Sequence, residues 1–244
     1  MNIPQRSTLH GIEVAPRPLA AYRGIVSAEL LDEVAVLAAA LDGARVLQIT
    51  AAAYGEVAEL VAPSVGLLRG FGLDAHWRVV WPDDRALDVA KRISDAMRGT
   101  ASALDQDDLY AYIELNRRCA AALGNEWDIV VVHDPEPLAL IATESAPQAA
   151  WIWRCHVDAS TPSPAVWDLL RVFVLGYDAF VFTAAEFCPP HLDRERLVVL
   201  GSKATERGRF DQVLGEVRDS LAVAARLPSG SRTPVDEPTA ATTR

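Results

Sequence analysis

The stretch ARVLQITAAAYGEVAEL, residues 44–60, decides the fold. It predicts an apolar strand over 44–50, a turn at Gly55 and a helix that begins at Glu56. A strand buried on both faces that leads directly into a helix is typical of a parallel α/β sheet. Ligands of such sheets bind beyond the carboxyl ends of the strands, so the loop at Gly55 is the first candidate site.

The same alternation continues along the chain. Short apolar runs rich in Val, Ile and Trp lie at 75–81, 128–134, 149–157, 179–184 and 196–200. Helical stretches separate them, at 56–70, 85–98, 106–123, 137–145 and 164–176. Strands and helices in this order imply right-handed crossovers and a doubly wound sheet. The sequence therefore predicts a single Rossmann-like, mostly parallel α/β domain over residues 23–201.

Other segments flank this domain. Residues 1–22 hold three prolines and no hydrophobic periodicity, so we expect an N-terminal arm on the surface without an element of its own. We expect Ser27 to cap a first helix that Gly43 closes. An apolar stripe within 202–227 predicts a C-terminal amphipathic helix at 206–226, and residues 228–244 have the composition of a disordered tail.

Composition excludes several classes of protein. The 244 residues are 50% hydrophobic and carry a formal charge of −10, which argues against nucleic acid or an anionic membrane as the main partner. The three cysteines are far apart and predict neither a disulfide framework nor a metal knuckle. No segment resembles a signal peptide or a membrane span. We expect a cytoplasmic protein that needs no cofactor.

Polar residues follow two of the predicted strands. In HDPEP, residues 133–137, His133 and Asp134 could orient a sugar hydroxyl or act as a base. Alternatively, they could form a turn at the strand end in which both side chains make their hydrogen bonds within the chain. In RCHVDAS, residues 154–160, the alternation of Arg154, His156 and Asp158 predicts that all three face the same side. An ion pair between Arg154 and Asp158 explains this pattern equally well.

Other chemistries are less favoured by these residues. Two histidine-bearing strand ends could converge on a metal ion, but no spacing enforces such a site, and we predict none. There is no GxSxG motif for a nucleophilic serine. We assign the tryptophans mainly to the core, although one could stack on a sugar ring.

Several motifs in register resemble a known family. HDPEP at 133–137, WIWRCHVDAS at 151–160 and YDAFVFTAAEF at 177–187 are similar to the N-terminal half of trehalose synthases of the glycosyltransferring type, as is GFGLDAHWRVV at 70–80. The resemblance covers roughly residues 22–200. It implies the N-terminal half of a GT-B fold, from retaining enzymes that join a nucleotide-activated glucose to free glucose.

The resemblance also implies roles for the polar residues. His156 corresponds to a histidine placed against the donor sugar near the reaction centre, which makes it the candidate catalytic residue. The expected sugar-binding residues are His133, Asp134 and Glu136 on the acceptor side, with Arg154 and Asp158 flanking His156.

One loop departs from the family pattern. Where the family has several glycines, this chain has Tyr54, Gly55 and Glu56, one residue shorter. Bare glycine backbone lets N–H groups approach a diphosphate, whereas a carboxylate about 4 Å away would repel it by about 4 kcal/mol at an effective dielectric constant near 20. Ser94 and Asp95 likewise stand where the family has His and Asn. We therefore interpret Tyr54, Gly55 and Glu56 as a degenerate form of the family's donor-binding loop.

Two functional hypotheses follow. In the first, the chain is an acceptor-side sugar-binding domain for glucose or trehalose and is not catalytic alone, because we find no second Rossmann domain for the nucleotide. In the second, it is half of a split glycosyltransferase that takes a nucleotide-sugar only with a partner chain. The helix at 206–226 could mediate pairing with a partner or with a second copy. A metal-dependent hydrolase ranks last.

Overall fold

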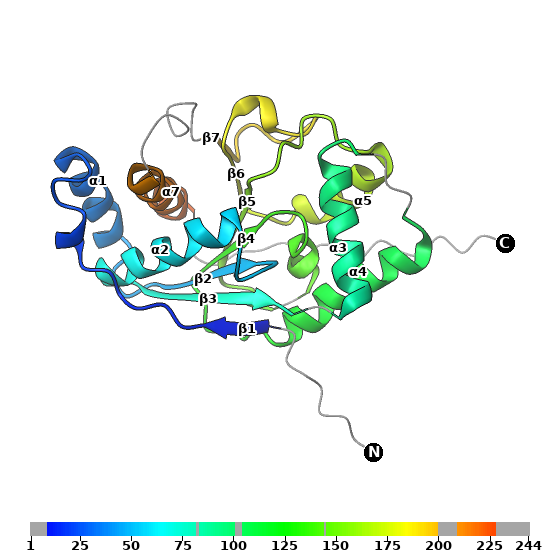
Figure 1. The fold of residues 1–244 in the computed structure, drawn as a ribbon, viewed down its shortest axis with the longest axis horizontal. Coiled ribbons are helices and arrows are strands. Elements are labelled where there is room, and N and C mark those ends of the chain that lie inside the picture. The colour runs from blue at the N-terminus through cyan, green and yellow to red at the C-terminus, as the bar shows by residue number, and fades with distance from the viewer. Residues whose placement is uncertain (1–8, 82, 101–103, 144, 200–208, 228–244) are drawn as a thin grey trace, which may run out of the picture.

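A seven-stranded sheet forms the centre of the protein in the computed structural model, which describes residues 9–81, 83–100, 104–143, 145–199 and 209–227 (Figure 1). The strand order is β1-β3-β2-β4-β5-β6-β7, and every pair is parallel except β1–β3. The strands are β1 Leu9–Ile12, β2 Arg45–Thr50, β3 Asp74–Val80, β4 Ile129–His133, β5 Ala150–Cys155, β6 Ala179–Phe182 and β7 Leu197–Val199. The predicted α/β class and mostly parallel sheet are confirmed.

Helices cover both faces of the sheet (Figure 1). On one face lie α1 Ala28–Ala39, α2 Glu56–Gly70 and α7 Arg209–Ala224, which share an apolar core with the sheet. On the other lie α3 Asp84–Met97, α4 Gln106–Ala121 and α5 Pro164–Val174. Short 3-10 turns occur at η1 Leu19–Ala21, η2 Leu138–Ala142 and η3 Ala185–Phe187. The result is the doubly wound arrangement that alternating strands and helices predict.

One predicted helix, 137–145, is only the five-residue 3-10 turn η2. Two of its carbonyl groups accept hydrogen bonds from side chains. The Tyr177 hydroxyl donates to the Leu138 carbonyl, and Thr143 Oγ1 donates to the Leu140 carbonyl. An α-helix would need these carbonyl groups to accept from N–H groups four residues ahead. Apolar periodicity could not show this competition.

The N-terminal arm contains an element that the sequence did not indicate. Strand β1 pairs antiparallel with β3, with Leu9 opposite Val80 and Ile12 opposite Trp77, so the expectation of no element within residues 1–22 is wrong. Pairing along a sheet edge uses backbone groups, and four residues are too few to show a period of two. The domain boundaries predicted at 23 and 201 stay predictions.

The helices α1 and α7 confirm most of their sequence signals. Ser27 Oγ accepts a hydrogen bond of 3.2 Å from the Leu30 N–H, as expected. Gly43 does not close the helix: α1 ends at Ala39 with Ala40 as its C-cap, and Gly43, with a left-handed φ of 74°, lies in the turn that follows. The buried apolar residues of α7 that pack in the same cluster as α1 and α2 are Leu214, Val217, Leu221, Val223 and Ala224, and Val213 is buried as well. This stripe is therefore covered by the chain itself. The predicted tail 228–244 lies outside the described residues.

The sheet's topology indicates where a ligand would bind. From β2 the chain moves to β3 on one side and then returns to β4 on the other, so the strand order reverses between β2 and β4. In doubly wound sheets this reversal opens a crevice at the carboxyl ends of the strands. None of the described helices is long and apolar enough to cross a membrane.

Candidate functional site

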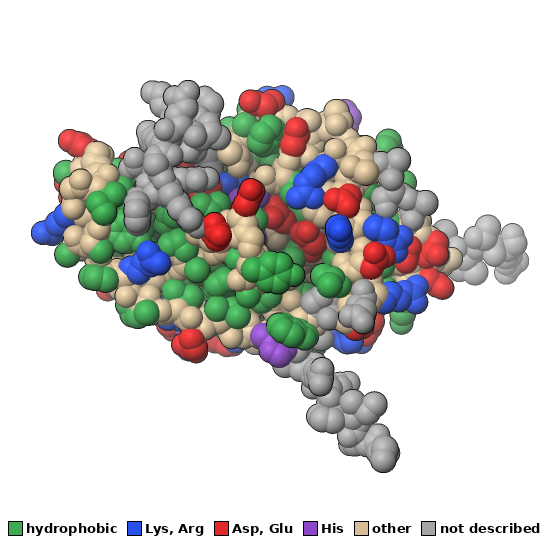
Figure 2. All heavy atoms as spheres, in the orientation of Figure 1, with side chains coloured by type: hydrophobic (Ala, Val, Ile, Leu, Met, Phe, Trp, Pro, Cys, Tyr) green, Lys and Arg blue, Asp and Glu red, His purple; other side chains and the backbone are tan. Residues whose placement is uncertain are grey.

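A cleft of about 390 Å³ opens at the carboxyl ends of β5 and β6, between α2 and α7. This volume lies at the lower end of the range for small-molecule sites. Figure 2 shows acidic side chains in red near the middle of the molecule, over the end of α2 where the helix begins. The residues lining the cleft are Glu56, Val57, Glu59, Leu60, Arg154, His156, Thr183 and Glu216.

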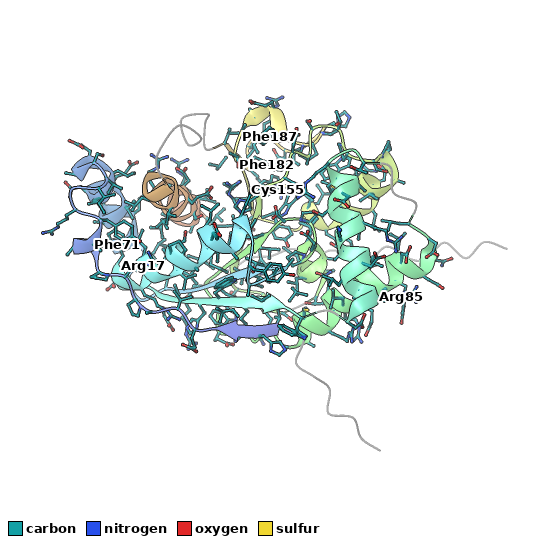
Figure 3. All side chains as sticks on the ribbon, in the orientation of Figure 1. Arg17, Phe71, Arg85, Cys155, Phe182 and Phe187 are labelled. Carbon is teal, nitrogen blue, oxygen red and sulfur yellow. The ribbon has the colours of Figure 1, made fainter. Side chains whose placement is uncertain are left out.

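The period of two along the strands places the polar groups on the face covered by α2 and α7. Gln48 lies opposite Val131 in the register of β2 with β4, so His133, two residues on, points to the same side as Val131. His133 in turn lies opposite Arg154 of β5. At the same end of the sheet, Figure 3 shows Cys155 and Phe182, which are paired residues of β5 and β6, together with Phe187.

His133 and His156 contact each other directly. His133 Nδ1 lies 2.9 Å from His156 Nε2, and His133 Nε2 lies 2.6 Å from Gln48 Oε1. Burial, together with the nearby charge of Arg154, lowers the pKa of His133 to about 3. The same causes hold the pKa of His156 well below its usual value, so both rings are neutral at pH 7. The ends of β4 and β5 therefore bring the two histidines together.

Asp134 holds the turn that follows β4. Its Oδ1 accepts a hydrogen bond of 2.7 Å from the His156 N–H, and its own N–H donates to the Arg154 carbonyl. Asp134 has a left-handed φ of 63°, a conformation that Asp tolerates better than most residues. Burial raises the pKa of Asp134 above its ordinary value. The carboxylate therefore positions the His156 backbone. Its role in sugar binding stays a prediction.

Glu136 lies apart from the lining of the main cleft. One of its carboxyl oxygens, Oε2, is buried without a hydrogen-bond partner, while the side chain contacts Ser94. Burial and the neighbouring Asp134 raise the pKa of Glu136 to about 7. Glu136 can thus hold a proton near neutral pH, which is unusual for a carboxyl group.

Arg154 is occupied entirely by contacts within the chain. A guanidinium has five N–H donors. Here Nε and Nη2 donate to the Glu216 carboxylate at 2.8 and 2.5 Å, Nη1 donates to the carbonyls of Cys155 and Val181, and Nη2 also reaches Thr183 Oγ1. The Arg154 side chain is only 1% exposed. It lines the cleft as part of an ion pair that leaves no donor for a ligand.

Asp158 does not lie beside Arg154 and His156. Strand β5 ends at Cys155, so the alternation that would align residue 158 with them stops before it gets there. Asp158 is exposed and accepts a hydrogen bond from the Ser160 N–H. The prediction that the three residues share one face is wrong for Asp158, and Arg154 pairs with Glu216 in place of Asp158.

The predicted donor loop follows β2 and begins α2. Gly55 is the N-cap residue, with φ 89° and ψ −178°, a conformation that essentially only glycine adopts. Tyr54 is 80% exposed, and Glu56 lines the cleft from the first turn of α2. A carboxylate here is favourable for the helix, because the N-terminus of a helix carries a partial positive charge. The same carboxylate occupies the end where a phosphate would bind.

Metal binding and aromatic stacking receive little support at this site. Among the described residues, no group of three or more His, Cys, Asp and Glu side chains is arranged to hold a metal ion. Trp77, Trp151 and Trp153 are buried in the core, as expected. Trp81 is 58% exposed and packs against His10, with the two ring planes tilted by 41°.

Three residues of the site carry no clear sequence signal. Gln48 lies within a mostly apolar strand, between Leu47 and Ile49. Thr183 follows β6, and Glu216 borders the apolar stripe of α7, where a charged residue usually faces solvent. Only the folded chain brings Thr183 and Glu216 to Arg154.

The fold and the cleft define the class of protein: a Rossmann-like α/β domain with a small polar site at the carboxyl edge of its sheet. The model of the family described as "Trehalose synthase, N-terminal domain" matches residues 48–189, and the chain belongs to this family. Its sheet corresponds to one half of a GT-B fold.

Similar proteins include trehalose synthases from three organisms. The protein from Rubrobacter xylanophilus is 40% identical over 199 residues, which is 79% of this chain and 48% of the relative. The proteins from Pyrococcus horikoshii and Thermococcus litoralis are 33% and 32% identical over 75% and 73% of this chain, and 45% and 44% of their own lengths. The chain thus spans about half the length of the relatives it matches.

Proposed function

We propose that this domain binds a small neutral sugar, such as glucose or trehalose, in the cleft beside His156, and that it does not transfer a nucleotide-activated sugar on its own. The observation that carries the proposal is the charge of the cleft lining. Three carboxylates, from Glu56, Glu59 and Glu216, face a single cation, Arg154. Since Glu216 already neutralises Arg154, the remaining field is negative.

A neutral polyhydroxyl ligand suits this lining. Hydroxyl groups can donate to carboxylates and to neutral imidazole nitrogen, and these are the groups that Glu56, Glu216 and His156 present. Leu60 and Val57 supply apolar surface for the faces of a sugar ring. An anion finds no free donor on Arg154, because its five N–H groups are engaged within the chain.

The repulsion between Glu56 and a bound diphosphate is weaker than the value for two charges in close contact. Glu56 is exposed at the rim, where water and salt screen its charge. We therefore expect the repulsion to weaken nucleotide-sugar binding by about tenfold rather than a thousandfold, which corresponds to about 1.4 kcal/mol.

Calorimetric titration tests the proposal. We expect the isolated chain to bind glucose or trehalose with a Kd in the millimolar range and to show no heat with UDP-glucose at the same concentrations. Glu56→Gln should raise any affinity for UDP-glucose by no more than about tenfold, and it should weaken glucose binding because the lining loses a charged hydrogen-bond acceptor. The matched control is Glu114→Gln, a carboxylate of α4 far from the cleft lining. UDP-glucose binding tighter than glucose binding in the unaltered chain would refute the proposal.

A second function is favoured by one observation: the chain covers about half of each relative's length. If it is half of a split glycosyltransferase, the C-terminal half of the Rubrobacter xylanophilus relative supplies a stand-in for the missing partner. We then expect trehalose from UDP-glucose and glucose only when both polypeptides are mixed. Absence of product in a mixture where the two halves demonstrably associate counts against this alternative.

A further inference from the structure

We propose that Gln48 is a specificity-determining residue, because it sets the direction of a hydrogen-bonded relay from Gln48 through His133 to His156 and so presents His156 to the cleft as a hydrogen-bond acceptor. The ligand class that this relay selects is one that donates a hydroxyl hydrogen. This inference deepens the proposed sugar binding and rests on it for the identity of the ligand, whereas the relay itself is testable without any ligand.

The geometry of the relay comes from three adjacent segments. Gln48 of β2 is 4% exposed and His133 of β4 is 6% exposed, and Gln48 Oε1 lies 2.6 Å from His133 Nε2. His133 Nδ1 lies 2.9 Å from His156 Nε2, with the two ring planes within 17° of each other. Both contacts are within hydrogen-bond distance, so the three side chains form one continuous path from the buried sheet to the cleft.

Counting protons along this path leaves one consistent arrangement. A carbonyl oxygen only accepts, so Gln48 Oε1 requires the hydrogen of His133 to be on Nε2. Because a neutral imidazole carries a single N–H, His133 Nδ1 must then accept from His156 Nε2–H. His156 Nδ1 is consequently left with a lone pair and no hydrogen.

The lone pair on His156 Nδ1 is the feature by which the cleft would discriminate between ligands. His156 lines the cleft, and among the described residues no partner donates to its Nδ1. The surrounding acceptors, Glu56 and Glu216, are also unable to donate when ionised. A cleft lined by acceptors binds a ligand with hydroxyl donors more tightly than a ligand that offers only phosphate oxygens, which cannot donate.

The tautomers themselves can be measured by long-range ¹H–¹⁵N NMR at pH 7 on the full chain. We expect both His133 and His156 to carry hydrogen on Nε2. In Gln48→Met, which keeps the volume but removes the acceptor, His133 should lose this fixed tautomer and show a mixture of the two. Ser64→Ala is the control, because Ser64 lines the small adjoining cavity and donates only to the Leu60 carbonyl of its own helix. It should leave both tautomers unchanged.

Glucose titration supplies the second readout. Gln48→Met should weaken glucose binding by about tenfold, the loss expected for one well-oriented hydrogen bond, and Ser64→Ala should not. Two results would overturn the relay even if glucose binds. One is hydrogen on Nδ1 of both rings in the unaltered chain, and the other is tautomers that stay the same in Gln48→Met. Conversely, the expected tautomers without any glucose or trehalose binding would reject the proposed function and leave the relay intact.

Discussion

Replacing Glu216 by leucine should lower the free energy of unfolding by about 3–5 kcal/mol, because it leaves the Arg154 charge buried without its counter-ion. Arg154 is 1% exposed, and its carboxylate partner is 11% exposed. Leucine itself fits the apolar stripe of α7, so the cost would come from the charge and not from packing. Chemical denaturation followed by circular dichroism measures the change.

Arg154→Met should cost less than Glu216→Leu, since Glu216 faces the cleft and can be hydrated there once its partner is gone. The double variant should regain much of the lost stability, because an apolar pair in place of a buried ion pair is often neutral or stabilising. Asp168→Leu breaks the exposed Asp168–Arg171 pair and should change stability by less than about 1 kcal/mol. Additive costs in the double variant would show that the pair does not act as a unit.

Glu136→Gln should stabilise the protein at pH 8 and have little effect near pH 4.5. The native pKa of Glu136 is raised to about 7 from 4.5, so the folded state binds more protons than the unfolded state across this window. Stability associated with Glu136 is therefore fully present below pH 4.5 and is lost as the pH rises through 7. We expect a gain of about 1–2 kcal/mol at pH 8 for Gln, which is less than the full shift implies because the residue is partly accessible.

The difference in unfolding free energy between Glu136→Gln and the unaltered chain, measured at several pH values, isolates this effect. That comparison is needed because His133 and His156 act in the opposite direction: their depressed pKa values make the protein lose stability as the pH falls below 6.5. Glu114→Gln is the control, because the pKa of Glu114 is lowered by Arg117 and its effect has the opposite sign. A difference curve that is flat from pH 4.5 to 8 would contradict a buried, protonated Glu136.

The order of the elements was predictable from local pattern alone. Apolar runs at 44–50 and 128–134 and the N-cap at Ser27 are local signals, and the strands and the first helix confirm them. Strand β1 escaped prediction because edge pairing depends on a distant backbone and not on its own four residues. In place of the helix expected at 137–145 the chain forms a 3-10 turn whose Leu138 carbonyl accepts from the Tyr177 hydroxyl, a contact with a residue far along the chain that no local pattern shows.

The candidate site was only partly predictable. His133 ends β4, Asp134 follows it and His156 follows β5, and the carboxyl ends of parallel strands lie at the same edge of the sheet, so the proximity of these residues follows from a parallel sheet. Asp158 was misplaced because the sequence cannot show that β5 ends at Cys155. Gln48 and Glu216 were missed because one lies in a strand and the other on a helix border, and neither residue type signals chemistry at such a position.

The sequence by itself determined the α/β class, the order of strands and helices along the chain, and the family. Hydrophobic periodicity and short motifs depend only on neighbours along the chain, which is why they can be read without the structure. The tertiary structure alone decided the charge of the cleft and the protonation of its histidines. Those properties depend on burial and on contacts such as Arg154 with Glu216, which lie 62 residues apart in the chain. Electrostatic interactions depend on distance through space and on exclusion of water, and no local pattern of residues encodes either.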